Sequence, residues 1–324
     1  MRYAIIGTGA IGGFYGGRLA RAGFDVHFLL HSDFEYVRDN GLRVDSYDGS
    51  FVISHPQAYA SVAGMPPCDV VIVALKTTAN GGLPAMLAPL LTERTLVLLI
   101  QNGVGVEADV EAALPGVQLA AGLAYICTTK VGPGHIEHTS NGKLSVANYS
   151  CRDQGLIDGL LADLGAAGIR AAAVDYAKAR WMKAMWNMPF NGPCSVLGQT
   201  TDRMLASPSG ERLVRAVGAG GDAHGRLVRA LLAEVIGAAR ACGAVGIDES
   251  VGERMIEMTR NMPPYSPSMK VDCDLGRPME IEYLYTKPIA MAREAGYAMP
   301  HMEMVEMQLR AIEELRAVGP AVGQ

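Results

Sequence analysis

The stretch Gly7-Thr8-Gly9-Ala10-Ile11-Gly12 decides the fold of this chain. It follows a short apolar run at residues 3–6 and opens a helical pattern that continues to about residue 22. In such a loop the first glycine allows a tight turn, the second lets a pyrophosphate approach the backbone, and the third lets helix and strand pack closely. The helix N-terminus adds N–H groups and a positive dipole that favour phosphate. The stretch therefore predicts a dinucleotide site; the alternative is a glycine-rich turn in another kind of α/β protein.

Beyond this loop, the first half of the chain alternates apolar runs with helical patterns. The run at residues 69–75 is nearly all Val, Ile, Ala and Leu, which indicates a parallel strand covered on both faces. Helices are predicted at residues 83–91, 106–114 and 153–164, and a hairpin at 42–45 and 51–54. Other strands are predicted at 25–30, 95–100, 119–129, 134–138 and 143–146, and residues 169–174 form a last strand or a linker. This order predicts a doubly wound sheet.

Beyond about residue 174 every pattern is helical. Helices are predicted at residues 176–186, 211–217, 226–242, 251–261, 280–295 and 302–318. We therefore expect an α/β Rossmann-type domain at residues 1–173 and an all-α domain at residues 174–324. A five-residue repeat, identical at 212–216 and at 226–230, is interpreted as a small duplication that lengthens a helix–helix connection.

Composition excludes several classes of protein. The 28 basic and 33 acidic residues give a net charge of −5, which argues against a nucleic-acid partner. No apolar run is long enough to cross a membrane, and the first residues do not resemble a signal peptide. The six cysteines form no C-x-x-C pair, as expected of thiols in a reducing compartment. We expect a cytoplasmic protein without a membrane partner. We also expect no metal site, since His135 and His138 would face opposite sides of a strand.

The end of the second predicted strand bears on the choice of dinucleotide. An NAD site wants a carboxylate there, to accept a hydrogen bond from the ribose 2′-OH. This chain has His31 and Ser32, which could donate to a 2′-phosphate, and Lys76 could add a cation. Asp33 counts against this interpretation if it points inward. We predict NADP(H); the alternative is that His31 is a solvated loop histidine.

A row of polar residues in the second half is the candidate reacting centre. Lys183, Asn187 and Asn191 are spaced i, i+4, i+8, so they share one face of a helix. Their neighbours are Trp and Met, and polar groups in such company are costly unless they meet a ligand or each other. A lysine there can protonate the oxygen of a carbonyl that receives a hydride. The alternative is a solvated polar stripe. A second polar cluster contains Ser268, Arg277 and Glu280.

Taken together, these motifs resemble the ketopantoate reductase (2-dehydropantoate 2-reductase) family along nearly the whole chain. The resemblance rests on the glycine loop, on Leu75-Lys76, on Gln101-Asn102-Gly103-Val104-Gly105, on Gly132-Pro133-Gly134-His135-Ile136, on Trp181-x-Lys183-x-x-x-Asn187-x-x-x-Asn191, and on Ser268-Met269 with Glu280. It implies a Rossmann-type cofactor domain, a helical substrate domain, and a substrate cleft between them. The implied activity is NADPH-dependent reduction of ketopantoate to pantoate, a step of pantothenate and coenzyme A biosynthesis.

The resemblance also implies a role for each site residue. Lys183 would protonate the ketone oxygen, and Glu280 would contact both Lys183 and the cofactor ribose. Asn187, Asn191 and Ser268 would hold the substrate, and Asn102 would contact substrate and nicotinamide. The implied cofactor-binding residues are Gly7, Thr8, Gly9, Ala10, Ile11, Gly12, His31, Ser32, Lys76, Asn102, Thr128 and Glu280. A homodimer is expected.

The chain departs from the family pattern at two points. His31 stands where the family usually has Arg, and Tyr285-Thr286 replaces its Asn-Gly. The first departure bears on the choice between NADP and NAD, and the second leaves open a reductase of another 2-oxo acid. A protein of a different class, a dinucleotide sensor without chemistry, is disfavoured because it would need no lysine beside the nicotinamide.

Overall fold

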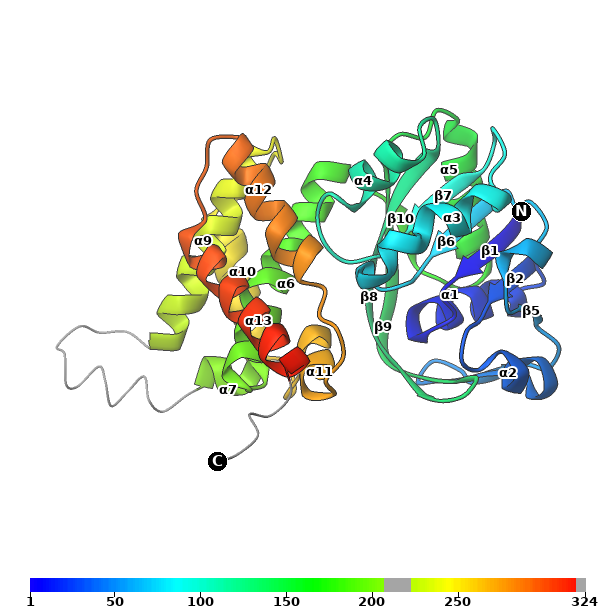
Figure 1. Ribbon diagram of the computed structural model, residues 1–324, viewed down its shortest axis with the longest axis horizontal. Helices are drawn as coiled ribbons and strands as arrows, with labels where there is room; N and C mark the ends of the chain where they lie inside the picture. Colours follow the sequence, from blue (N-terminus) through cyan, green and yellow to red (C-terminus); the bar gives the residue numbers. More distant parts are fainter. Residues whose placement is uncertain (207–222, 319–324) are drawn as a thin grey trace. The chain divides into compact units, whose positions relative to one another are not determined.

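The computed structural model describes residues 1–206 and 223–318 and divides into two compact units (Figure 1). The first unit is Met1–Asn102 with Val106–Tyr176, and the second is Gly103–Gly105 with Ala177–Gln324. The predicted helix at 211–217 and the first copy of the five-residue repeat lie outside the described residues. Within the described ranges, no helix is long and apolar enough to cross a membrane.

The first unit is built on one mixed sheet. Its strands are β1 Arg2–Ile6, β2 Asp25–Leu29, β3 Leu42–Ser46, β4 Phe51–Ile53, β5 Gln57–Tyr59, β6 Val70–Val73, β7 Leu96–Leu99, β8 Gln118–Gly132, β9 His135–Asn148 and β10 Ala171–Ala173. The order is β4-β3-β9-β8-β7-β6-β1-β2-β5, with β10 beside β9. Strands β5, β2, β1, β6, β7 and β8 pair in parallel, as the doubly wound prediction requires.

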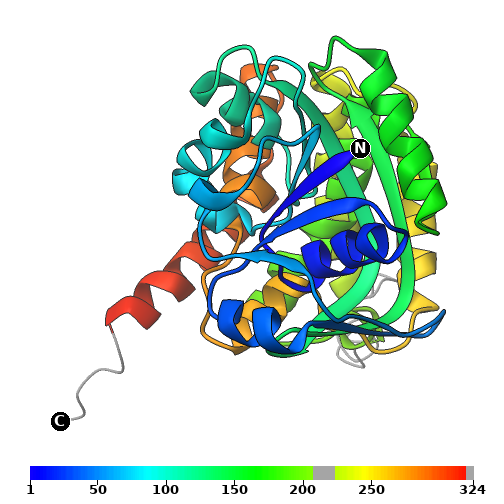
Figure 2. The ribbon, with the colours of Figure 1, turned by 90° about the vertical axis from the view of Figure 1, so that its right-hand side faces the viewer.

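The helices of this unit are α1 Ala10–Arg21, α2 Phe34–Asn40, α3 Leu83–Leu87, α4 Val106–Ala113 and α5 Gln154–Ala166, with short 3-10 turns at Val62–Gly64, Thr77–Gly82 and Ala88–Leu90. Every residue of β6 and β7 is buried, which for β6 confirms the inference from the apolar run at residues 69–75. Helix α1 packs against β1, β2, β8 and β9, and Figure 2 shows it in front of the two long strands. The loop between β1 and α1 therefore joins two elements that pack against each other.

The predictions for the long strands of this unit were wrong in detail. The strands predicted at 119–129, 134–138 and 143–146 are two long antiparallel strands, β8 and β9. Asn141 and Gly142, which lie between the predicted strands 134–138 and 143–146, form an irregularity within β9, with φ of 67° and 104°. Turn residues of this kind also suit a β-bulge, so composition alone did not separate the two. Helix α2 and strand β5 were not predicted.

The second unit is helical, with no strand among its described residues. It contains α6 Tyr176–Leu197, which starts one residue before the boundary, then α7 Thr201–Ala206, α9 Ala223–Ala241, α10 Glu249–Arg260, α11 Ser268–Asp274, the π-helical turn η4 Glu282–Thr286, α12 Lys287–Glu294 and α13 Pro300–Val318. Helix α6 is longer than the predicted 176–186 because it continues through Pro189 and Pro193. Helices α7 and α11 were not predicted.

Candidate active site

The glycine loop has the local geometry that its sequence predicts. Gly7 has a φ of 96°, and a Cβ there would lie 2.7 Å from the backbone nitrogen of Leu75. A Cβ on Gly9 would meet nothing within 4 Å, so the backbone at this position is open to a ligand. A Cβ on Gly12 would lie 2.2 Å from the carbonyl oxygen of Gly7. The three glycines therefore serve a turn, a close approach and helix packing, and the loop fits a dinucleotide pyrophosphate.

The start of α1 is available to an anion. Its N-cap is Gly9, no side chain among the described residues caps it, and its first turn carries no acidic residue. The N–H groups of this first turn therefore keep their preference for a negatively charged group. Thr8, which is buried, donates a hydrogen bond from its hydroxyl to the carbonyl oxygen of Leu29 at 2.8 Å. This bond ties the loop to the end of β2.

The residues after β2 are divided between solvent and the interior of the unit. His31 and Ser32 are exposed, whereas Asp33 is buried. The Asp33 carboxylate accepts a hydrogen bond from the backbone of Gly134 at 3.0 Å and pairs with Lys130 Nζ at 2.6 Å. This carboxylate, which would have favoured NAD, is therefore occupied by groups of its own unit. The sequence did not indicate this pair, because about a hundred residues separate Asp33 from its two partners.

The loop after β6 carries Lys76, which is exposed at the N-cap of the turn Thr77–Gly82. The side chain of Gln101 holds this loop, since its amide nitrogen donates to the carbonyl oxygen of Leu75 at 3.0 Å and to Asn80 Oδ1 at 2.6 Å. Gln101 is thus a supporting residue that the sequence reading did not assign. The next residue, Asn102, is partly buried and ends the first segment of the first unit.

Thr128 has a hydrogen bond within the sheet. Its hydroxyl donates to the carbonyl oxygen of Glu137 at 2.9 Å, across the β8–β9 pair. The hydroxyl proton is thereby engaged, although the oxygen can still accept. A cofactor contact by Thr128 stays a prediction.

The predicted polar row lies along α6, and two of its members contact each other. Asn187 and Asn191 are buried, and Asn191 Nδ2 donates to Asn187 Oδ1 at 3.3 Å. Asn191 Oδ1 accepts from the backbone nitrogen of Met269 at 3.2 Å. Since Met269 is the second residue of α11, this bond fixes the start of α11, and with it the exposed Ser268, beside the row. The structure therefore brings Asn187, Asn191 and Ser268 into one neighbourhood.

Lys183 has a strongly perturbed pKa. The pKa of its ammonium is lowered to about 7, mainly by burial and also by the neighbouring Arg180 guanidinium, while the Glu280 carboxylate raises it in part. Arg180 lies one helical turn before Lys183 and is 1% exposed, and Glu280 is 7% exposed. Glu280 thus favours the charged form of Lys183, but the desolvation of Lys183 outweighs this effect. A lysine with a pKa near neutrality can both hold and release a proton at physiological pH.

Arg277, the other cation of the second polar cluster, is paired within its own unit. Its guanidinium contacts the buried carboxylate of Asp272 at 3.0 Å. It is therefore less suited to bind a substrate carboxylate than the hydroxyl of Ser268. Among the described residues, no group of three or more His, Cys, Asp or Glu side chains could hold a metal ion.

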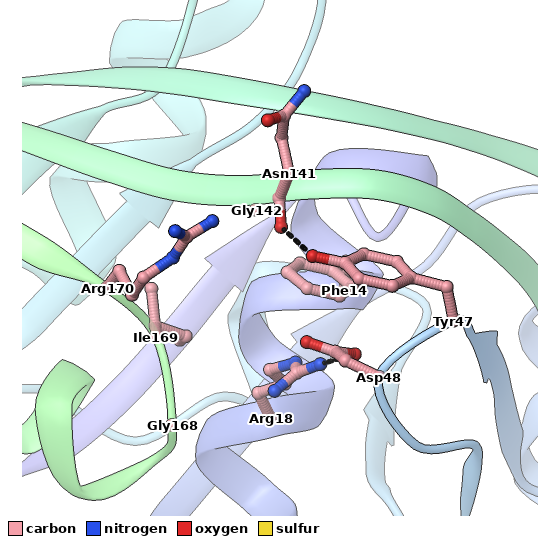
Figure 3. Close-up of a pocket in the computed structure, with 9 residues that line it drawn as sticks. All are labelled: Phe14, Arg18, Tyr47, Asp48, Asn141, Gly142, Gly168, Ile169 and Arg170. Atoms are coloured by element: carbon pink, nitrogen blue, oxygen red, sulfur yellow. Dashed lines mark hydrogen bonds and ion pairs between the residues drawn. The ribbon is translucent and has the colours of Figure 1, made fainter.

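A small cavity of about 140 Å³ lies elsewhere in the first unit (Figure 3). It is lined by Phe14, Arg18, Tyr47, Asp48, Asn141, Gly142, Gly168, Ile169 and Arg170. Arg18 is ion-paired with Asp48, and the Tyr47 hydroxyl donates to the carbonyl oxygen of Asn141, so much of the lining is already engaged. Sites for small organic ligands usually span about 300–1,000 Å³. This cavity contains none of the predicted site residues and is too small for a dinucleotide.

Comparison with known proteins gives a consistent match along the chain. The family model described as "Ketopantoate reductase PanE/ApbA" matches residues 3–150. The model of its C-terminal part matches residues 175–221 and 220–313. The second match is split close to the repeat of residues 212–216 at 226–230.

Individual proteins match over nearly their full length. A Nostoc protein named 2-dehydropantoate 2-reductase is 39% identical, over 98% of this chain and 97% of its own. The crystal structure of 2-dehydropantoate 2-reductase from Geobacter metallireducens is 36% identical, with a TM-score of 0.88, and covers 96% of this chain and 99% of its own. The structure of the enzyme of that name from Methylococcus capsulatus is 30% identical, with a TM-score of 0.84 and 99% coverage of both chains.

Proposed function

The chain belongs to the ketopantoate reductase family, and from this premise we propose that it reduces 2-dehydropantoate to pantoate with NADPH. We assign the cofactor to residues 1–173 and the substrate chemistry to residues 174–324. The observation that carries the proposal is a half-buried lysine, Lys183, with a pKa of about 7 on the same helix as a hydrogen-bonded asparagine pair. A dinucleotide sensor without chemistry would have no use for such a group.

The first unit supports cofactor binding. The loop Gly7-Thr8-Gly9-Ala10-Ile11-Gly12 fits the pyrophosphate, because Gly9 is open and the start of α1 is uncapped. The preference for NADPH rests on exposed donors where an NAD site needs an acceptor, namely His31, Ser32 and Lys76. Asp33 does not oppose it, since its carboxylate is bound by Lys130 and Gly134. When bound, the nicotinamide supplies the hydride.

Lys183 is the proton donor in this proposal. Hydride addition to the 2-oxo carbon develops negative charge on the ketone oxygen, which an ammonium group both stabilises and protonates. The pKa of about 7 makes Lys183 a stronger acid than an ordinary lysine. The Glu280 carboxylate favours the charged form, so that an adequate fraction of Lys183 carries the proton before reaction.

Neutral donors hold the substrate. Asn187 and Asn191 offer amide groups already oriented by their mutual bond, and Ser268 offers a hydroxyl at the start of α11. Asn102 is assigned to the substrate and to the nicotinamide end of the cofactor. Hydrogen bonds to a charged carboxylate are stronger than those between neutral groups, so a few such donors suffice without an arginine.

Reduction of a different 2-oxo acid is the second candidate. It is favoured by Tyr285-Thr286, where the family has Asn-Gly. Tyr285 is fully buried, so its effect on a substrate would pass through the residues it contacts.

The test is oxidation of NADPH and NADH by the purified protein over a panel of 2-oxo acids that includes ketopantoate. Ketopantoate with NADPH should give the highest kcat/KM. A higher value for another acid would replace the substrate assignment, and no oxidation with any acid would refute the reductase proposal.

We also propose that the enzyme is a cytoplasmic homodimer. All six cysteines are free thiols, as suits a reducing compartment. Helix α13 exposes Met304, Met307, Leu315 and Val318 at spacings that place them along one side of the helix. A second copy of the chain would cover this apolar stripe. Sedimentation of the wild type and of Leu315→Glu tests the dimer, and a monomeric wild type would refute it.

A further inference from the structure

Tyr285 is hydrogen-bonded into the backbone of α6. Its hydroxyl accepts from the backbone nitrogen of Gly192 at 2.7 Å and donates to the carbonyl oxygen of Met188 at 2.6 Å. In an α-helix these are the two groups that pair with each other, because residue 192 lies four positions after residue 188. The hydroxyl therefore links the N–H and C=O groups that bond directly to each other in a regular α-helix. The Tyr285 side chain is fully buried while it does so.

The bridged part of α6 is intrinsically weak as a helix. Pro189 and Pro193 have no N–H, so the carbonyl groups of Met185 and Pro189 lose their usual helical donors. Gly192 adds backbone freedom between the two prolines. Asn187 and Asn191, the proposed substrate residues, lie in this same stretch. The positions of the two asparagines therefore depend on a helical segment that lacks some of its own backbone hydrogen bonds and is stabilised by contacts with other segments.

Gly192 and Tyr285 fit each other closely. A Cβ on Gly192 would lie 2.3 Å from the Tyr285 hydroxyl oxygen and 2.6 Å from Cγ1 of Val305. A side chain at position 192 would thus displace the hydroxyl from its two backbone partners.

The turn that carries Tyr285 contacts a second part of the site. Tyr285 belongs to the π-helical turn η4, which begins two residues after Glu280. In the same turn the carbonyl oxygen of Tyr283 accepts from the backbone nitrogen of Val104 at 3.0 Å, and a Cβ on Gly103 would lie 2.5 Å from that oxygen. Asn102 directly precedes this contact. Single π-helical turns occur frequently at functional sites.

We propose that Tyr285 is a positioning residue for the reaction: by bridging Met188 and Gly192 it holds α6 in the shape that aligns Asn187 and Asn191. The bond from Asn191 to Asn187 and the bond from Met269 to Asn191 both depend on that shape. Tyr285 itself does not contact the substrate. The substrate role of the two asparagines rests on the proposed function, whereas the bridge to α6 does not.

The direct test is Tyr285→Phe, which removes the hydroxyl and keeps the ring. Displacement of reacting groups by about 1 Å can cost on the order of 100-fold in rate, so we expect kcat/KM for the 2-oxo acid to fall about 10- to 100-fold, mainly through KM. Binding of NADPH should be unchanged. Both tryptophans of the chain, Trp181 and Trp186, lie on α6, so their fluorescence and near-ultraviolet circular dichroism should also change.

The chain offers a matched control in the same unit. The Tyr297 hydroxyl donates to the backbone oxygen of Ala233 at 3.5 Å, and a Cβ on Gly237 would lie 2.1 Å from the Tyr297 ring. Tyr297→Phe and Gly237→Ala therefore repeat the two perturbations away from the asparagine row. If Tyr285→Phe fails to fold, Gly192→Ala displaces the same hydroxyl and should give the same loss.

The outcomes separate this proposal from the proposed function. Unchanged KM and kcat in Tyr285→Phe, or an equal loss in Tyr297→Phe, would overturn the positioning role. If the wild type reduces no 2-oxo acid, the proposed function fails and the tryptophan signals decide alone. A change confined to Tyr285→Phe and Gly192→Ala would then support the bridge, and unchanged signals would overturn it.

Discussion

The pH dependence of kcat/KM should follow the titration of Lys183. Its pKa of about 7 means that the protonated fraction falls from about 0.9 at pH 6 to about 0.1 at pH 8. Because the ammonium form is the proposed proton donor, kcat/KM for reduction should decrease about tenfold over this range. The assay is NADPH oxidation at saturating coenzyme and limiting 2-oxo acid, in buffers of constant ionic strength.

Two neighbours of Lys183 should move this profile in opposite directions. Arg180 lowers the pKa of Lys183 and Glu280 raises it. Arg180→Gln should therefore shift the fall to higher pH, and Glu280→Gln should shift it to lower pH. Arg180→Lys keeps the positive charge and is the control, with a profile close to that of the wild type. A flat profile between pH 6 and 8, or shifts of the wrong sign in both variants, would refute Lys183 as the titrating acid.

Three further predictions concern binding. NADPH should bind more tightly than NADH, and Lys76→Ala should weaken NADPH more than NADH; equal affinities of the wild type in a fluorescence titration would contradict the 2′-phosphate assignment. Ser268→Ala should raise KM for the oxo acid roughly 10- to 100-fold, from about 1.5–3 kcal/mol lost with a hydrogen bond to a charged group, while coenzyme affinity stays the same; an unchanged KM would place the carboxylate elsewhere. Gly9→Ala should fold normally, because a Cβ there meets nothing within 4 Å, but it should bind coenzyme poorly in a calorimetric titration. Gly12→Ala should instead lose about 1–3 kcal/mol of stability in thermal unfolding, because its Cβ overpacks the helix against the loop. Equal destabilisation of both variants would contradict the geometry of the loop.

Local patterns predicted most of the fold. The apolar runs of β1, β6 and β7, the glycine loop and the change to helical periodicity near residue 174 depend on nearby residues only, and the structure confirms the α/β unit and the helical unit. The merging of three predicted strands into β8 and β9 depends on pairing across the sheet. A glycine such as Gly142 has the same composition signal in a turn and in a bulge.

In the candidate site, too, local spacing predicted some residues, whereas residues with long-range contacts were missed. The row Lys183, Asn187 and Asn191 follows from spacing along one helix, and the contact between the two asparagines agrees with the requirement that buried polar groups find partners. The supporting residues were missed because their contacts join distant segments. Asp33 with Lys130, Gln101 with Leu75, and Tyr285 with Met188 have no periodic signature.

The most direct test of the whole account is a single-turnover measurement on Lys183→Ala with coenzyme and the best 2-oxo acid. The variant should bind NADPH as tightly as the wild type, because the loop from Gly7 to Gly12 is untouched. Its chemical step should slow by about 10²- to 10⁴-fold, the usual contribution of a general acid. Hydride transfer at the wild-type rate in Lys183→Ala would contradict the account.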